Sequence, residues 1–148
     1  FLTLQGIETV TLRMERHVEN AVKVATWLEG HEGVEAVTYA GLPSSPSHAR
    51  AETLLPKGAG ALFTVALKGG YAACVKFVDS LKLFSHVANL GDTRSLVIHP
   101  ASTTHRQLSA EGRKAAGAAD NVGRLSIGIE DVADIIADRD QALKAANA

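Results

Sequence analysis

The stretch NVGRLSIGIED, residues 121–131, is decisive for the fold because an arginine lies inside an otherwise apolar strand pattern. Side chains of a β-strand alternate between two faces. One face would then carry three aliphatic side chains: Leu125, Ile127 and Ile129. The other would carry a charge, a hydroxyl and a gap: Arg124, Ser126 and Gly128. The aliphatic face belongs against a core, and we expect the second face to look onto a ligand.

Arg124 itself has two interpretations. A guanidinium is a planar fork of donors that binds a carboxylate through two parallel hydrogen bonds. A position on a central strand also restricts its rotamers, which lowers the entropy lost on binding a ligand. The alternative is an internal ion pair with a nearby acid, such as Glu130 or Asp131. The residues alone leave both interpretations open.

Strand and helix patterns alternate along the rest of the chain. Apolar residues at three- and four-residue spacing predict one long amphipathic helix over residues 1–30. Strands are expected at 34–39, 61–67 and 95–98, in addition to the stretch 121–131. Further helices are expected at 71–84, 109–117 and 131–148, with Ser109 and Asp131 as N-caps. These elements predict an α/β (α+β-like) fold in which helices pack on one face of a roughly four-stranded sheet.

Composition excludes several classes of protein. The 148 residues fit one domain, and 46% hydrophobic with 21% charged residues is ordinary for a globular protein. A net charge of −1 argues against nucleic acid, and no apolar run reaches the length of a membrane span. The single cysteine, Cys74, excludes an internal disulfide and favours a cytosolic setting. Because Phe1 lies inside a helical pattern, we expect the chain to be a piece of a longer protein.

Other reactive residues have less specific patterns. The segment 95–105 gathers hydroxyls and imidazoles that could orient a ligand, but Ser and Thr after a proline also make local turn bonds. No GxSxG, HxxxH, HxH or P-loop motif is present, so we expect no serine nucleophile, metal site or phosphate loop. Cys74 is expected in the core, and the acidic run Asp134, Asp138 and Asp140 on a solvated helix face.

Four segments together resemble a known family: RMERHVENAVKVATWLE, VTYAGLPSSPSH, LKGGYAACVKFVDSLKLFSHVANLGDTRSLVIHPASTTHRQLS and NVGRLSIGIEDVADIIADRDQAL. They resemble the C-terminal domain of the pyridoxal-phosphate enzymes of cysteine and methionine metabolism, in the branch of the O-acetylhomoserine sulfhydrylases. The pair LFSHVANLGD and RSLVIHPASTTH is the more specific to that branch. Cystathionine lyases and synthases usually have an acidic residue before the Ser-Leu pair, where Arg94 stands here.

The resemblance implies a fold and a substrate site. The fold would be the C-terminal domain of a fold-type I enzyme, with a mostly antiparallel sheet, a linking helix over 1–30 and a small domain over 31–148. Arg124 matches the arginine that binds the substrate α-carboxylate. Ser95 matches a serine whose neighbourhood helps to hold that carboxylate, and Thr104 matches a segment that lines the same cleft.

The resemblance also implies what this chain lacks. The lysine that holds the cofactor belongs to a large domain with no counterpart here, and no lysine of the chain has a serine three positions before it. We therefore expect no catalytic, cofactor-binding or metal-binding residue, and no pyridoxal phosphate bound to this chain alone. The intact enzyme would use the cofactor to convert O-acetylhomoserine and sulfide into homocysteine and acetate in methionine biosynthesis. It would be a cytoplasmic homo-oligomer, typically a tetramer.

Two alternatives remain open. Within the same family, the intact protein could be a cystathionine γ-synthase or a methionine γ-lyase, so the sulfur donor is undecided. In a different class, the chain could be an isolated non-catalytic domain that self-associates through its mixed sheet face or its first helix.

Overall fold

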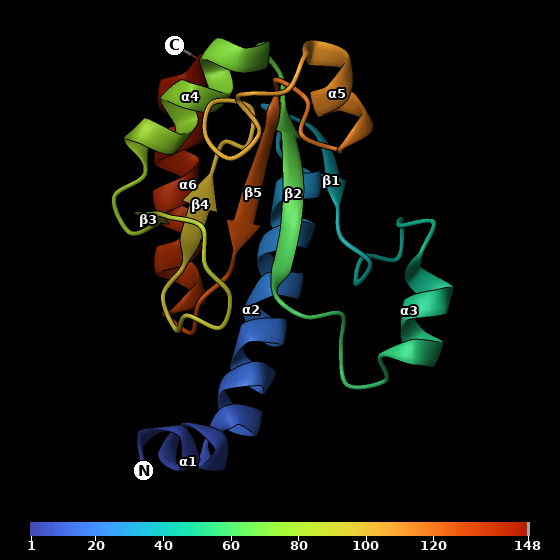
Figure 1. Cartoon of the computed structure of the whole chain (residues 1–148), viewed down its shortest axis with the longest axis vertical. Helices are drawn as coiled ribbons and strands as arrows, with labels where there is room; N and C mark the ends of the chain where they lie inside the picture. Colours follow the sequence, from blue (N-terminus) through green and yellow to red (C-terminus); the bar gives the residue numbers. More distant parts are fainter. Residues whose placement is uncertain (148) are drawn as a thin grey trace.

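The computed structural model describes residues 1–147, and its elements are shown in Figure 1. The helices are α1 (Leu2–Glu8), α2 (Val10–Glu29), α3 (His48–Leu54), α4 (Gly70–Ser80), α5 (Ala110–Ala115) and α6 (Val132–Asn147). The strands are β1 (Val34–Thr38), β2 (Leu62–Leu67), β3 (Ser85–His86), β4 (Leu96–Ile98) and β5 (Val122–Ser126). No helix in the described part of the chain is long and apolar enough to cross a membrane.

The strands form one sheet in the order β1-β2-β5-β4-β3, so β5 is central. All neighbouring pairs are antiparallel except β3 and β4, which are parallel. The predicted α/β class is confirmed, but the expected count of four strands is too low by one. Strand β3 is only two residues long, and such a segment has no alternation that could reveal it in the sequence.

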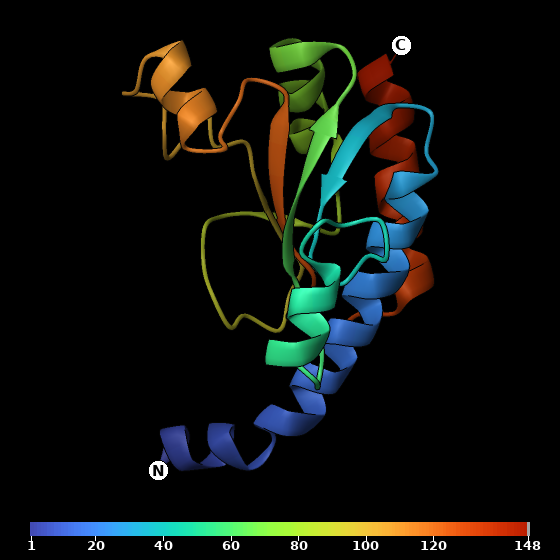
Figure 2. The ribbon, with the colours of Figure 1, turned by 90° about the vertical axis from the view of Figure 1, so that its right-hand side faces the viewer.

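Three helices cover one face of this sheet. The core cluster joins side chains of α2, α4 and α6 to those of β2 and β5, and includes Leu28, Val65, Phe77 and Leu125. Cys74 lies in the same cluster, as expected. Figure 2 shows α2 and α6 on one side of the strands, with α5 and the loop between β3 and β4 on the other. The prediction that helices pack on one face is therefore confirmed for the long helices.

Alternation along β5 places Arg124 on the face away from the core. Gly123 and Leu125 are buried, whereas Arg124 and Ser126 are half-buried. The expected position of Ile129 in the core is wrong, because this side chain is exposed. The strand ends at Ser126, and the Ile129 amide then donates to the Thr93 carbonyl (3.0 Å) outside the sheet ladder.

The single helix expected over residues 1–30 is two helices. The chain breaks at Thr9, where the Arg13 guanidinium donates to the Thr9 hydroxyl and to the Gly6 carbonyl. Side chains of α2 are buried only from His17 onward. The apolar side chains before that point are exposed, namely Phe1, Leu2, Leu4, Ile7, Val10, Leu12 and Met14. We call this set the N-terminal apolar surface. The segment that carries it, α1 with the start of α2, extends away from the sheet in Figure 1.

One side chain of α6 caps the end of α4. Helix α4 stops at Ser80 rather than continuing to residue 84, because the Asp138 carboxylate accepts from the amides of Lys82 and Leu83 (2.9 Å each). The expectation that Asp138 is simply solvated is therefore wrong. The predicted caps are present: Ser109 Oγ accepts from the Gly112 amide (3.1 Å), and Asp131 accepts from the Ala133 amide (2.8 Å).

Candidate functional site

Arg124 lies in a row of residues that crosses the open face of the sheet. Directly opposed residues on neighbouring strands direct their side chains to the same face. The pairings join Thr38 to Thr64, Thr64 to Arg124, and Arg124 to Ile98. The half-buried guanidinium is thus flanked by a hydroxyl on β2 and an aliphatic side chain on β4.

The Arg124 guanidinium has no acidic partner within the described residues. Across residues 1–147, the Arg124 side chain makes no ion pair and no hydrogen bond. Glu130 instead accepts from Ser95, and Asp131 caps α6. The internal ion pair with Glu130 or Asp131 is therefore wrong, which leaves the positive fork available to an external carboxylate.

A narrow hollow adjoins Arg124 on this face. Its wall is formed by residues of β4, β5 and the loop that follows β3: Val87, Asn89, Leu96, Val97, Ile98 and Ser126. A second hollow shares Ser126 and is lined on its other sides by Met14, His17, Ala61, Leu62, Leu90, Gly91 and Asp92. The loop 87–92 borders both hollows, so its position decides how much room a ligand has beside the guanidinium.

Larger hollows lie elsewhere, on the side of α2 that faces α3. One contains His48 and Glu52, and another contains Glu15 and Lys57. Neither contains Arg124. We take Arg124 and the loop 87–92 as the candidate site because a guanidinium with no ion pair in residues 1–147 lies there, although the hollow beside it encloses less space.

Arg94 is bound within its own loop. Its guanidinium donates to both oxygens of Asp92, at 3.2 and 3.1 Å, and its amide also donates to this carboxylate (3.0 Å). These bonds lower the pKa of Asp92 to about 2 and raise the pKa of Arg94. Arg94 is thus bound to Asp92, a residue of the loop that borders the site.

Ser95 is fully buried, and its polar atoms are all engaged. Its amide donates to Glu130 Oε1 (2.6 Å) and its hydroxyl to Glu130 Oε2 (2.9 Å), while the Gly128 amide donates to the hydroxyl (2.9 Å). The serine therefore ties the start of β4 to the segment after β5. It makes no direct bond to Arg124.

Thr104 lies in the exposed turn after β4, where its hydroxyl is 2.8 Å from His105 Nδ1. Its neighbours make local bonds: the Thr103 hydroxyl donates to the His99 carbonyl (2.8 Å), and Ser102 Oγ contacts His99 Nδ1 (2.9 Å). The expected local bonds to the backbone are confirmed for Ser102 and Thr103, whose hydroxyls both donate to the His99 carbonyl. The structure brings Thr104 into hydrogen bonding with neither Arg124 nor Ser95 in the described chain.

Two polar residues of α2 near the site were not anticipated. His17 Nδ1 lies 2.6 Å from the Ile127 carbonyl, and the Asn20 amide group donates to the carbonyls of Gly128 (3.0 Å) and Glu130 (2.9 Å). Both are buried. Their spacing relative to Ala21 and Val24 places them on the buried stripe, and polar residues on such a stripe are the signal that could have identified them.

Comparison with known proteins adds the family. The family model described as "Cys/Met metabolism PLP-dependent enzyme" matches residues 1–144. An O-acetyl-L-homoserine sulfhydrylase of Thermus thermophilus is 50% identical over 143 residues, which are 97% of this chain and 34% of that protein. The corresponding enzyme of Corynebacterium glutamicum is 52% identical over 91% of this chain and 31% of its own length. A homocysteine synthase of Schizosaccharomyces pombe is 49% identical over 99% of this chain and 34% of its own length.

A solved structure gives the same result. A Campylobacter jejuni crystal structure, named as an O-acetylhomoserine (thiol)-lyase with a pyridoxyl-lysine phosphate, superposes with a TM-score of 0.89 at 42% identity. The superposition covers 95% of this chain and 34% of that one. The chain thus spans about one third of the length of the proteins that it matches. It belongs to the family of Cys/Met metabolism PLP-dependent enzymes.

Proposed function

We propose that this chain is part of a pyridoxal-phosphate-dependent O-acetylhomoserine sulfhydrylase and that Arg124 binds the α-carboxylate of the amino-acid substrate. The observation that carries the proposal is a half-buried guanidinium on the central strand that has no acidic partner among residues 1–147. Relatives at about 50% identity that bear this enzyme's name support the choice of reaction. The reaction is O-acetylhomoserine plus sulfide to homocysteine plus acetate. A cytoplasmic location and assembly into a homo-oligomer belong to the same proposal.

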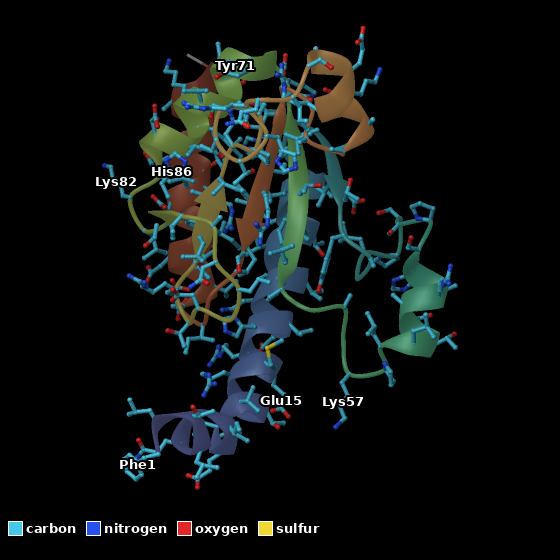
Figure 3. All side chains as sticks on the ribbon, in the orientation of Figure 1. Phe1, Glu15, Lys57, Tyr71, Lys82 and His86 are labelled. Carbon is cyan, nitrogen blue, oxygen red and sulfur yellow. The ribbon has the colours of Figure 1, made fainter. Side chains whose placement is uncertain are left out.

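The residues of this chain do not make a site for the cofactor by themselves. All of its lysines are exposed, and none lines the hollow beside Arg124. Figure 3 shows two of them, Lys57 and Lys82, at the periphery of the molecule. We infer that the cofactor lysine and the phosphate site come from a large domain outside these residues. The cofactor, when bound there, supplies the electron sink for the reaction.

The part of this chain in the reaction is positioning. A carboxylate bound by the Arg124 fork has its orientation fixed, which fixes the α-C–H bond relative to the cofactor and removes rotational freedom from the substrate. Ser95 acts from behind the site by holding β4 to the segment after β5. Thr104, on the exposed turn, would reach the cleft from its rim once the large domain is in place.

A chimera tests the proposed reaction. This chain would replace the matching third of the Thermus thermophilus relative, and the product formed from O-acetylhomoserine would be measured with sulfide and, separately, with cysteine. We expect homocysteine with sulfide. Cystathionine formed only with cysteine would instead identify a cystathionine γ-synthase. A folded chimera that contains pyridoxal phosphate and uses neither donor would overturn the proposal.

A second candidate, a domain that associates with itself, is favoured by the N-terminal apolar surface. Phe1, Leu2 and Leu12 are 89%, 80% and 68% exposed, and several exposed large apolar side chains on one segment are typical of an interaction surface. Sedimentation of the 148-residue chain tests this candidate. A dimer that dissociates when Leu2 and Leu12 are changed to Asp would support self-association, and a monomer at all concentrations would exclude it.

A further inference from the structure

A compact set of hydrogen bonds joins the end of β5 to the start of β4. Glu130 accepts from both the amide and the hydroxyl of Ser95, and Ser95 Oγ accepts from the Gly128 amide. The Ile129 amide donates to the Thr93 carbonyl (3.0 Å). The segment that leaves β5 is thus connected to the loop that enters β4 at four points, and the Glu130 carboxylate provides two of them.

The other side of this segment is fixed by α2. His17 contacts the Ile127 carbonyl, and Asn20 donates to the carbonyls of Gly128 and Glu130. Because α2 packs on the sheet, these bonds fix the position of residues 127–130 relative to the helical layer. The backbone of Glu130 is therefore fixed by α2, and its carboxylate binds the end of the loop that precedes β4, at Ser95.

A buried cation of α6, Arg139, is attracted by the Glu130 carboxylate. Arg139 on α6 is completely buried, with Cζ 4.2 Å from the centre of the Phe84 ring and Nη1 donating to the Ile135 carbonyl (3.3 Å). Its Nε and Nη2 atoms have no hydrogen-bond partner in residues 1–147. Burial lowers the pKa of Arg139 to about 9, and attraction from Asp138 and Glu130 opposes that shift.

We propose that Glu130 is a positioning residue for substrate binding. Its carboxylate holds the loop 87–95 against the end of β5 and so sets the width of the hollow in which Arg124 meets the substrate carboxylate. The loop residues Val87 and Asn89 line that hollow, and the chain reaches Ser95 only a few residues later. This inference rests on the proposed role of Arg124.

The change Glu130→Gln keeps the shape of the side chain and an acceptor for the Ser95 amide. Its NH2 group, however, cannot accept from the Ser95 hydroxyl. In the chimera, we expect KM for O-acetylhomoserine to rise about tenfold, as the loss of one charge-assisted hydrogen bond implies, with kcat changed much less. The matched control is Glu32→Gln, at an exposed turn before β1, which should leave both constants unchanged.

A double-mutant cycle separates this inference from the proposed function. If Glu130 acts through Arg124, Glu130→Gln should raise KM in the parent and have no further effect in the Arg124→Ala background. An unchanged KM for Arg124→Ala alone would reject the proposed function. A raised KM for Arg124→Ala, combined with no KM effect of Glu130→Gln or with the same effect in both backgrounds, would reject only the positioning role. Ser95→Ala removes the same hydroxyl bond and takes the place of Glu130→Gln if that variant does not fold.

Discussion

Replacement of Gly128 by alanine should destabilise the chain more than any other change of one methyl group near the site. A Cβ built at this position lies 2.5 Å from the Ser95 amide nitrogen and 2.6 Å from the Thr93 carbonyl oxygen, and it also meets Glu130 Oε2. Two of these atoms belong to the backbone and cannot rotate away. The φ angle of Gly128 is not positive, so the whole penalty comes from close approach.

The size of the effect follows from the contacts that must lengthen. Overpacking by one methyl group costs about 1–3 kcal/mol, and each buried hydrogen bond that is lost costs about 1–3 kcal/mol more. The bonds from Gly128 to Ser95 and from Ile129 to Thr93 both cross the affected gap. We therefore expect a loss of about 4 kcal/mol in the free energy of unfolding, or a decrease of about 8–16 °C in Tm for a chain of this size.

Thermal and urea denaturation followed by circular dichroism measure this loss. The matched control is Gly6→Ala in α1, where an added Cβ has no atom within 4 Å and the backbone is helical. This control should leave stability unchanged or raise it by up to about 1 kcal/mol, because alanine favours a helix more than glycine does. If Gly128→Ala unfolds at the same midpoint as the parent chain, residues 93–95 and 128–130 are not packed as described.

Two further predictions concern buried groups. Burial raises the pKa of the Cys74 thiol to about 12 from an ordinary 9.0, so Cys74 should react with a thiol reagent at about pH 8 only after unfolding. As pH rises, the thiol ionises first in the unfolded chain, so the stability that the buried neutral thiol contributes is complete below pH 9.0 and declines toward pH 12. The difference in free energy of unfolding between the parent and Cys74→Ala should shrink across that interval. Equal thiol reactivity in the native and the urea-unfolded chain would contradict the burial. Arg139→Met removes a buried charge, two of whose nitrogens have no hydrogen-bond partner in the described residues, and keeps an extended side chain against Phe84. Its Tm should therefore equal or exceed that of the parent. A decrease of several degrees would show that the attraction to Asp138 and Glu130 outweighs the cost of burial.

Features set by local sequence were predictable. Alternation in residues 122–126 gave the two faces of β5, and the three-and-four spacing of Cys74, Phe77 and Val78 gave the buried side of α4. Ser109 and Asp131 were recognisable as caps, because a cap bonds to an amide only two or three residues away. In each case the structure depends on residues that are close together in the chain, so a local sequence pattern predicts it.

Features set by contacts between distant segments were not predictable. Strand β3 exists only because Ser85 and His86 pair with Leu96 and Val97. The exposed first half of α2 has the same apolar spacing as the buried half, and only the position of the sheet distinguishes them. The bonds between Glu130 and Ser95 join residues 35 positions apart, and nothing in either local stretch indicates the other. Local sequence patterns therefore could not predict which residues line the hollow near Arg124.

The KM of Arg124 variants for O-acetylhomoserine tests the carboxylate role of this residue. Two parallel charge-assisted hydrogen bonds are worth about 3 kcal/mol together, so Arg124→Ala in the chimera should raise KM about 100-fold with a smaller loss of kcat. Arg124→Lys keeps the charge but not the planar pair of donors, so its KM should rise less than that of Arg124→Ala. The control Arg50→Ala, at an exposed position on α3, should leave KM and kcat unchanged. An unchanged KM for Arg124→Ala, in a folded chimera that forms homocysteine, would show that the guanidinium does not bind the substrate.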